Sequence, residues 1–206
     1  MLQAVSLTCR RGQRRVFSEL SLRLEAGQCC LVSGPNGSGK TSLLRILANI
    51  AQADEGQLIW RDRPVQSNDS DYRRQLVYGG HAPGLNGSLS VQENLDSLLM
   101  QDRVPLEREA CDQALLAGGL LAYRRVPVRQ LSAGQRRRVF LVRLSLSNRP
   151  LWILDEQLTA LDSAGQKFLG ELIAQHLHKQ GAVILTSHQT LPWDLEVQHL
   201  DLGQAC

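Results

Sequence analysis

The stretch that decides the fold reads Gly34-Pro35-Asn36-Gly37-Ser38-Gly39-Lys40-Thr41, and Ser42 follows it. Its spacing is that of a phosphate-binding P-loop, which joins the end of a buried strand to the start of a helix. The glycines let the backbone turn tightly, so that successive N–H groups point inward at a β-phosphate. The Lys40 ammonium adds a charge for the β and γ oxygens, and the Thr41 hydroxyl is an oxygen ligand for Mg²⁺. The stretch therefore predicts a nucleotide-binding α/β fold.

The sequence on both sides supplies the strand and the helix that such a loop requires. Residues Gln28 to Ser33 contain Cys-Cys-Leu-Val, which is typical of a buried strand that runs into the glycines. From Thr41 to Ile50, leucine and isoleucine recur on or near one face, which predicts a helix. Apolar and polar residues alternate in Leu2 to Leu7 and in Leu20 to Leu24, as they do in half-buried antiparallel strands. Two further strands are expected at Gly56 to Trp60 and Gln75 to Tyr78.

The middle of the chain is expected to be helical. Ser90 and Glu93 have the spacing of a capping box, which opens a helix that reaches Met100. Two further helices are expected at residues 107–117 and 133–147.

The last third alternates strand and helix. A strand at Leu151 to Leu154 is followed by a helix at Ser163 to His178 and a strand at Ala182 to Thr186. This order indicates a parallel sheet with crossover helices. We expect one α/β domain over residues 1–206, a P-loop fold with a parallel core sheet, an antiparallel β edge and a helical subdomain at roughly residues 84–147.

The composition narrows the class of protein. The chain has 206 residues and 43% hydrophobic content, and no segment approaches the ~18 apolar residues that would suggest a membrane span. The opening residues lack the basic-then-apolar order of a secretory signal. Five cysteines without a C-x-x-C pair indicate a reduced, cytosolic protein. A net charge of +3 is too small to argue for a nucleic-acid partner.

A second anion site is indicated at Leu131-Ser132-Ala133-Gly134-Gln135, where an amphipathic helix begins. The N–H groups at a helix N-terminus attract anions. Because the chain already has one phosphate cradle, a second one suggests that its phosphate belongs to another subunit. Taken alone, an ordinary helix N-cap would explain the same residues.

Polar residues also follow two of the expected parallel strands. Asp155 and Glu156 come directly after Leu151 to Leu154, at the sheet edge where α/β proteins bind ligands. Asp155 is suited to hold Mg²⁺ through water, and Glu156 to polarise the water that attacks a γ-phosphate. His188 follows the strand at Ala182 to Thr186, at the position expected for a γ-phosphate contact.

The order of these motifs resembles that of ABC-type ATPase domains along almost the whole chain: GPNGSGKT at 34–41, LSAGQ at 131–135, WILDE at 152–156, TALD at 159–162 and TSH at 186–188. The resemblance implies a subunit that hydrolyses ATP with Mg²⁺ and forms an ATP-dependent homodimer. In such dimers the LSGGQ-type loop caps ATP held by the opposite subunit's P-loop. This assigns Leu131 to Gln135 to the trans site and Asp162 to the dimer contact. Integral membrane transporter subunits are the implied partners, and the cytoplasmic face of the membrane is the implied location.

The sequence departs from the family pattern in several places. Arg11 stands where the family usually has an aromatic residue that stacks on adenine, so a planar guanidinium is the candidate there, with Val16 packing against the ring. Ala133 replaces the commoner glycine, and Gln157 stands where proline usually follows the catalytic glutamate. His81 occupies the position of a metal-contacting glutamine, which makes it a candidate catalytic residue and Mg²⁺ ligand.

One branch of the family has a similar loop and helix. Gly80-His81-Ala82-Pro83-Gly84 followed by Glu93-Asn94-Leu95 resembles the ATP-binding subunits of cytochrome c biogenesis haem exporters. The resemblance implies membrane partners of the cytochrome c maturation type and haem as the cargo.

Two other classes of protein compete with a transport ATPase. A soluble ABC ATPase of DNA repair or translation usually carries a second ATPase half or a long coiled-coil insertion, and the 89 residues between Thr41 and Leu131 leave no room for one. A P-loop kinase needs an acceptor pocket and a lid, and it would not explain LSAGQ or His188.

Two groups of charged residues are expected to have ordinary roles. Arg136, Arg137 and Arg138 would form a solvated helix face with an arginine–carboxylate pair or two. His176 and His178 lie near the end of an expected helix, where a cation suits the helix dipole.

Overall fold

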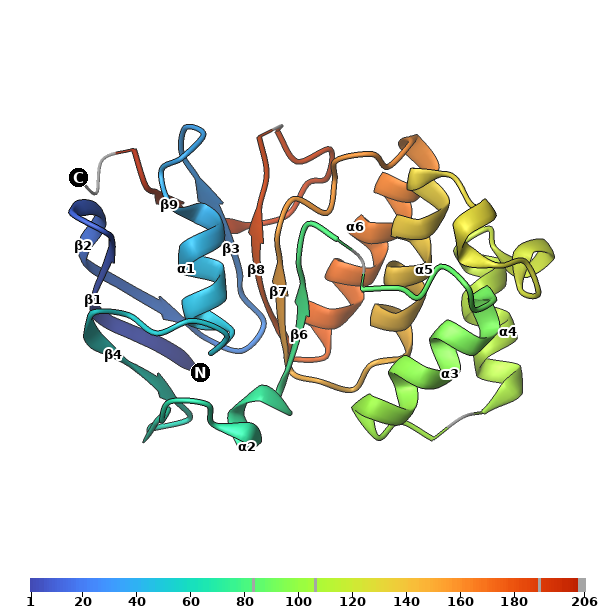
Figure 1. Ribbon diagram of the computed structural model, residues 1–206, viewed down its shortest axis with the longest axis horizontal. Coiled ribbons are helices and arrows are strands. Elements are labelled where there is room, and N and C mark those ends of the chain that lie inside the picture. The colour runs from blue at the N-terminus through green and yellow to red at the C-terminus, as the bar shows by residue number, and fades with distance from the viewer. Residues whose placement is uncertain (83, 106, 189, 204–206) are drawn as a thin grey trace. The chain divides into compact units, whose positions relative to one another are not determined.

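A computed structural model of the chain describes residues 1–82, 84–105, 107–188 and 190–203 (Figure 1). Pro83, one member of the loop compared above with haem-exporter subunits, lies outside the described residues. The chain forms two compact units. We call them the β unit, formed by residues 1–78, 149–156 and 176 onward, and the helical unit, formed by residues 79–148 and 157–175. The expectation of a single domain with a helical subdomain at 84–147 stays a prediction.

The antiparallel sheet of the β unit contains four strands in the order β2-β1-β4-β5. They are β1 (Leu2–Arg11), β2 (Arg14–Leu24), β4 (Glu55–Trp60) and β5 (Arg63–Pro64). β1 and β2 form a hairpin that closes at the pair Arg11 and Arg14, and Gly12 in its turn has a φ of 60°, which glycine adopts without strain. The predicted antiparallel edge is therefore confirmed.

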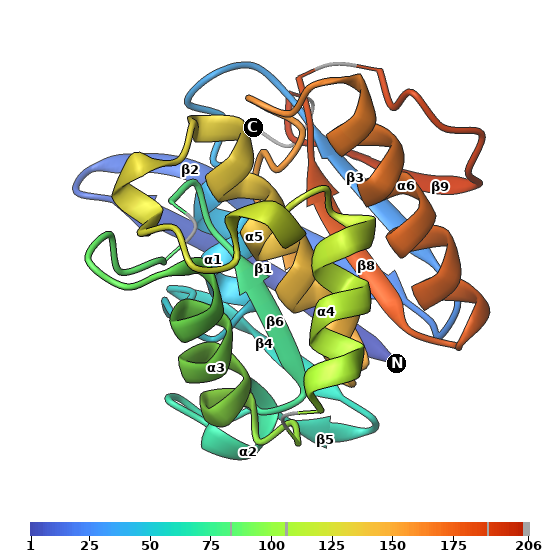
Figure 2. The ribbon, with the colours of Figure 1, turned by 90° about the vertical axis from the view of Figure 1, so that its right-hand side faces the viewer.

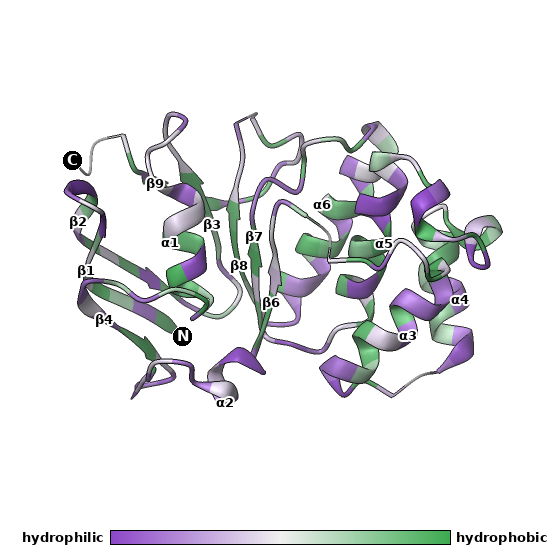
Figure 3. Cartoon of the chain, viewed as in Figure 1, coloured by the Kyte–Doolittle hydropathy of each residue, from purple (hydrophilic) through white to green (hydrophobic). Residues whose placement is uncertain are grey.

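The second sheet has five strands in the order β6-β7-β8-β3-β9. They are β3 (Cys29–Ser33), β6 (Leu76–Gly79), β7 (Leu151–Leu154), β8 (Ala182–Thr186) and β9 (Val197–Asp201). β3 pairs in parallel with β8 and β9, and β7 pairs in parallel with β8. Every residue of β7 and β8 is buried, which explains why both strands are apolar apart from Thr186 at the end of β8 (Figure 3). The predicted βαβ unit and parallel core sheet are confirmed.

Helix α1 (Lys40–Leu47) packs its apolar face into the core of the β unit. Leu43, Leu44 and Leu47 are fully buried there, and each such side chain contributes about 1.5–3 kcal/mol through burial. The helix ends before the predicted Ile50, because Asn49 has a φ of 56° and lies outside helical geometry. A short helix, α2 (Ser70–Arg73), follows later in the unit.

The helical unit contains α3 (Val91–Asp102), α4 (Arg108–Ala117), α5 (Ala133–Leu146) and most of α6 (Ser163–His178), with short 3₁₀ turns at Leu121–Tyr123 and Val128–Gln130. Both α3 and α4 contact α5 (Figure 2). The predicted capping box is present, because the Ser90 side chain accepts from the Glu93 N–H and the Glu93 carboxylate accepts from the Ser90 N–H. Arg143 of α5 donates from Nε and Nη2 to the buried carboxylate of Asp102, at 2.8 and 2.9 Å.

Some features depart from the sequence-based expectations. Strand β9, strand β5 and helix α2 were not predicted. The interpretation of His176 as a cation at a helix end is wrong, because its ring stacks on Trp152 with centroids 3.8 Å apart and planes 8° from parallel. Burial lowers the pKa of His176 to about 4, so the ring is neutral at physiological pH.

Candidate functional site

The phosphate loop joins β3 to α1, as the sequence predicts. Gly39 is the N-cap of α1, with a φ of 100°. A β-carbon on Gly39 would lie 2.3 Å from Cγ1 of Val16, so the β2 strand closes directly on the loop backbone. Lys40 donates from Nζ to the carbonyl oxygens of Gly34 and Pro35, at 2.8 and 3.0 Å. The lysine is thus held across the loop, with its charge at the site expected for phosphate.

A cavity of about 520 Å³ opens beside this loop. It is lined by Arg11, Arg14, Val16, Asn36, Gly37, Gly39, Lys40, Thr41, Ser42, Arg45 and Glu156. Nine of these residues were predicted from the sequence as nucleotide-binding or catalytic, and the remaining three loop residues, Gly34, Pro35 and Ser38, belong to the same turn. The lining contains four cationic side chains and one carboxylate, so the cavity is suited to a polyanion such as a nucleoside triphosphate.

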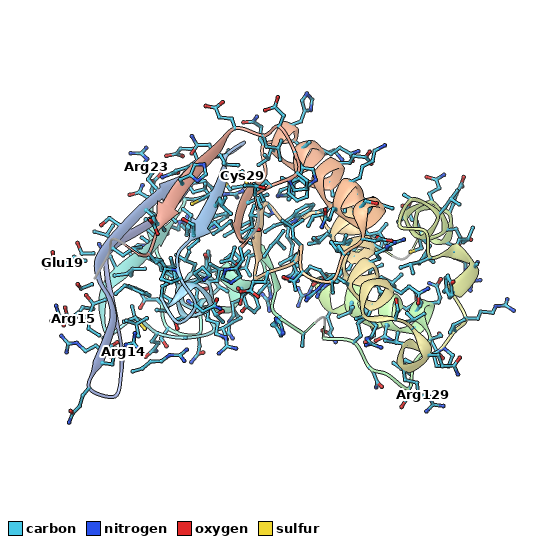
Figure 4. All side chains as sticks on the ribbon, turned by 90° about the horizontal axis from the view of Figure 1, so that it is seen from above. Arg14, Arg15, Glu19, Arg23, Cys29 and Arg129 are labelled. Carbon is cyan, nitrogen blue, oxygen red and sulfur yellow. The ribbon has the colours of Figure 1, made fainter. Side chains whose placement is uncertain are left out.

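Arg14 and Arg45 line the cavity but were not predicted as site residues. Arg14 begins β2, and its side chain projects from the hairpin beside Arg15 (Figure 4). Arg45 lies on α1, one turn beyond Thr41, which brings both residues to the same region of the helix surface. That i, i+4 spacing is the signal in the sequence that would have identified Arg45.

The guanidinium of Arg11 is fixed at the start of α1. Its Nη2 donates to Oγ of Ser42 at 2.9 Å, a contact that spans from the end of β1 to the first turn of the helix. Arg11 is therefore at the cavity, as predicted. Its stacking on adenine, and the packing of Val16 against that ring, stay predictions.

The acidic pair follows β7, and Thr186 at the end of β8 connects its two members. The Thr186 hydroxyl donates to Oδ1 of Asp155 at 2.9 Å, and its oxygen accepts from the Glu156 N–H at 2.9 Å. Asp155 is only 2% exposed, whereas Glu156 reaches the cavity. Glu156 has a φ of 52°, an unusual conformation for a non-glycine residue and one that is enriched at functional sites.

His188 and Glu156 form a direct pair in the β unit. Nε2 of His188 lies 2.9 Å from Oε1 of Glu156, and both side chains are partly exposed. The contact places an imidazole and a carboxylate at the carboxyl ends of two neighbouring parallel strands. A pair of this kind can orient a water molecule and move a proton.

In the helical unit, the LSAGQ motif forms the N-terminus of α5. Ser132 is the N-cap: its Oγ accepts from the Gln135 N–H at 3.1 Å, and the Gln135 side chain accepts from the Ser132 N–H at 2.9 Å. Ser132 and Ala133 are exposed, and Leu131 is buried beneath them. A β-carbon on Gly134 would lie 2.9 Å from the Ala160 carbonyl oxygen, so the motif contacts the TALD segment of its own chain.

Asp162, the predicted dimer contact, already has partners in the helical unit. Its carboxylate accepts from the Gly165 N–H at 3.0 Å and from Arg138 Nη2. These two hydrogen bonds lower the pKa of Asp162, the backbone donor more than the arginine. The arginine–carboxylate pair expected in this region is therefore Arg138 with Asp162. The carboxylate stays 61% exposed and accessible to a second molecule.

The expectation that Arg136, Arg137 and Arg138 all lie on a solvated face is wrong for Arg137. Its side chain is buried, 6% exposed, and it donates from Nη2 to the backbone carbonyl of His81 at 3.0 Å. His81 itself is exposed in the helical unit. Its roles in catalysis and metal binding stay predictions.

No group of three or more histidine, cysteine or acidic side chains among the described residues could hold a metal ion. Oxygen donors suited to Mg²⁺ are nevertheless present, in the Thr41 hydroxyl and the Asp155 carboxylate. Mg²⁺ usually keeps several waters and takes one or two protein carboxylates together with substrate phosphates, so the small donor set fits it. In the part of the chain that the structure describes, no helix is long and apolar enough to span a membrane.

Comparison with known proteins identifies relatives along nearly the whole chain. The family model described as "ABC transporter" matches residues 17–159. The chain is 46% identical over 191 residues to the "Cytochrome c biogenesis ATP-binding export protein CcmA" of Pseudomonas aeruginosa, covering 93% of this chain and 94% of the relative. It is 49% identical over 192 residues to the protein of the same name from Yersinia pestis, covering 93% and 87%.

Solved structures agree with the fold. A bacterial ABC transporter cassette in dimeric form superposes with a TM-score of 0.83 at 22% identity, covering 98% of this chain and 95% of that one. The ATP-binding subunit of another ABC transporter superposes with a TM-score of 0.82 at 21% identity, covering 91% and 79%. Together with the phosphate loop, the acidic pair and the LSAGQ helix, the family match and the relatives that are 46% and 49% identical favour a transport ATPase over an ATPase of DNA repair or translation. The chain belongs to the ABC transporter family, as an ATP-binding subunit that hydrolyses ATP.

Proposed function

We propose that this ATPase energises a membrane complex of cytochrome c maturation, and that the cargo is haem or a haem-linked intermediate. The relatives that are 46% and 49% identical to it are named for cytochrome c biogenesis and export. Its partners are integral membrane subunits of that system, and it acts as a peripheral protein at the cytoplasmic face of the inner membrane. The observation that carries the energising role is the cavity of about 520 Å³ beside the phosphate loop, whose lining includes four cationic side chains and Glu156.

Hydrolysis in this proposal depends on the pair formed by Glu156 and His188. The Glu156 carboxylate accepts a hydrogen bond from the attacking water and orients it toward the γ-phosphate. Nε2 of His188, 2.9 Å from Oε1, fixes that carboxylate before nucleotide binds, and donating to a γ-phosphate oxygen instead would require it to leave Glu156. Lys40 and the N–H groups of Gly37 and Gly39 receive the charge that develops on the β and γ oxygens.

Thr41 and Asp155 would hold the magnesium ion, with His81 as a further ligand. When bound, the ion neutralises charge on the β and γ oxygens. The Thr186 hydroxyl, which donates to Oδ1 of Asp155 at 2.9 Å, orients that carboxylate.

The active form in this proposal is a head-to-tail homodimer with two composite sites. Each nucleotide lies between one subunit's phosphate loop and the Leu131 to Gln135 helix start of the other, where Ser132 and Ala133 are exposed, with Asp162 at the contact between them. Two solved structures of one cassette with the same fold are dimeric, one of them bound to ADP and phosphate. Because the cavity and the helix start both attract anions, nucleotide is needed to bring the two subunits together.

Mixed dimers test the composite sites. Lys40→Ala damages the phosphate loop and Ser132→Arg damages the helix start, so each variant alone should be inactive. In a mixed dimer, one site combines both lesions and the other combines two intact halves. Mixing the purified variants should therefore restore ATPase activity, up to about a quarter of the wild-type rate if the sites act independently and the subunits pair at random. No recovery above the sum of the two single variants would refute the arrangement.

The pathway is tested by deleting the gene in its host. We expect loss of all c-type cytochromes with b-type cytochromes retained. The wild-type gene and a matched control, Lys167→Ala at a lysine that is 79% exposed, should restore them, whereas Lys40→Ala should not. Normal c-type cytochromes in the deletion strain would reject the pathway and leave the ATPase assignment intact.

A further inference from the structure

Two buried polar side chains converge on one short segment of backbone in the helical unit. Gln157, the residue that follows Glu156, is 2% exposed. Its Nε2 donates to the carbonyl oxygens of Gly79 and Gly80, at 2.9 and 3.0 Å. Gln157 therefore holds the backbone of the segment that leads into His81.

Arg137 of α5 reaches the same segment. Its Nη1 donates to Oε1 of Gln157 at 3.2 Å and to the Gly80 carbonyl at 3.3 Å, and its Nη2 donates to the His81 carbonyl at 3.0 Å. Three consecutive carbonyl groups are thus held by one amide and one guanidinium. We call this group of hydrogen bonds the Arg137–Gln157 latch.

The segment fits closely against α5 at its first residue. A β-carbon on Gly79 would lie 2.6 Å from Cζ of Phe140 and 3.2 Å from Nε2 of Gln157. Phe140 is fully buried, so the aromatic ring has little freedom to move aside. The backbone at Gly79 therefore cannot shift toward α5, and movement away from α5 requires the hydrogen bonds of the latch to break.

Simple stabilisation is a poor explanation for such a group. Burying a guanidinium costs several kcal/mol in desolvation, and apolar residues of similar volume usually serve stability as well or better. Arg137 also lies two residues beyond Gln135, on the helix whose exposed start is the proposed trans site. One end of the latch thus meets the His81 segment, and the other belongs to the element that presents Ser132.

We propose that Arg137 and Gln157 are positioning residues that couple the His81 segment to the start of α5. The latch transmits the state of the nucleotide sensed at His81 to the helix that caps the partner's nucleotide, and it does so through rigid hydrogen-bonded contacts. This inference rests on the proposed function, because it assumes that Ser132 to Gln135 acts in trans. Gln157, which replaces the usual proline, supplies the amide on which the coupling depends.

Hydrogen exchange measures the coupling without reference to turnover. The amides of residues 79–82 and of residues 134–138 should be protected together when MgATP is added to the wild-type protein. In Arg137→Met, and separately in Gln157→Leu, protection of the phosphate-loop amides should persist while residues 134–138 lose their response. Arg125→Met, the same chemical change at an exposed arginine, is the matched control and should respond like the wild type.

Kinetics supply the second readout. Arg137→Met should lower kcat about tenfold or more and leave KM for ATP within twofold, because the hydrogen bonds of the latch described above go to residues 79–81 and to Gln157, and not to the phosphate loop. Arg137→Lys should recover part of the rate, since its ammonium retains the charge and can still donate to a carbonyl. The double variant with Gln157→Leu should be no slower than the worse single variant, because both remove the same coupling.

Three outcomes would overturn the inference. They are an unchanged ATP response at residues 134–138 in both latch variants, a wild-type kcat in both, or a loss of kcat matched by an equal loss of ATP affinity. Should Arg137→Met fail to fold, Gln157→Glu provides the same test, because it keeps the size and the acceptor for Arg137 but loses the donor to Gly79 and Gly80. Failure of the mixed-dimer experiment above would instead reject the trans arrangement and leave the exchange result standing.

Discussion

The stacked pair of His176 and Trp152 predicts a pH-dependent term in stability. The imidazole lies against the indole with centroids 3.8 Å apart, and burial lowers its pKa from an ordinary 6.5 to about 4. The unfolded chain therefore binds a proton between pH 6.5 and pH 4 that the folded chain does not. The stabilisation is fully present above pH 6.5 and is lost as the pH falls toward 4.

The size of the effect follows from the two pKa values. Between neutral pH and pH 5, the titration of His176 should lower the free energy of unfolding by up to about 2 kcal/mol. Because the ring is only partly buried, solvent screening reduces this, and we expect about 1–2 kcal/mol. His176→Phe keeps a flat ring against Trp152 and removes the titration, so its stability should fall less between pH 7.5 and pH 5.

Urea unfolding at several pH values measures the difference between the two proteins. Subtracting the free energy of unfolding of His176→Phe from that of the wild type cancels the other titrating groups, such as Asp162. His178→Gln, at an exposed position two residues away, is the control and should follow the wild type. Parallel stability profiles for the wild type and His176→Phe would refute the reasoning.

Three further predictions concern the site. Glu156→Gln should retain ATP binding, lower kcat about a hundredfold or more and leave a persistent dimer with MgATP in sizing chromatography; wild-type turnover would rule out its role. Activity should fall more steeply on acidification in the wild type than in His81→Gln, because an imidazole ligates metal only when neutral; superimposable pH–rate profiles would count against a metal contact. Gly39→Ala should lose on the order of 2 kcal/mol more unfolding free energy than Gly12→Ala. Both glycines have a positive φ, but only Gly39 faces Val16, at 2.3 Å; equal losses would contradict the crowding argument.

Most strands and helices of the core could be predicted because the spacing of apolar residues in each segment fits only one kind of secondary structure. The strand Leu151–Leu154, the helix Ser163–His178 and the strand Ala182–Thr186 occur at the predicted bounds. Strand β9 (Val197–Asp201) was missed because its side chains are half-buried or exposed and carry no apolar pattern. It forms through backbone pairing with β3, which the sequence does not encode locally.

Some residues of the site could likewise be predicted from the sequence, and others could not. The phosphate loop and the acidic pair are contiguous motifs, so their residues could be named from the sequence. Arg14 and Arg137 could not, because the cavity that Arg14 lines and the carbonyl groups that Arg137 contacts are formed by residues far away in the chain. Arg137 illustrates the limit: within α5 it resembles its neighbours Arg136 and Arg138, and only the carbonyls of residues 79–81 distinguish it.

The capping box at Ser132 has a consequence for the cost of assembly. The cap uses a lone pair of the Ser132 oxygen and leaves the hydroxyl hydrogen able to donate outward. A phosphate oxygen arriving from another molecule would therefore meet a donor whose rotamer is already set by the Gln135 N–H. The conformational entropy of this loop is therefore lost when the single subunit folds, and not when two subunits associate. In the proposed dimer, association would need no local refolding of this loop, and opening after hydrolysis would leave it ready for the next encounter.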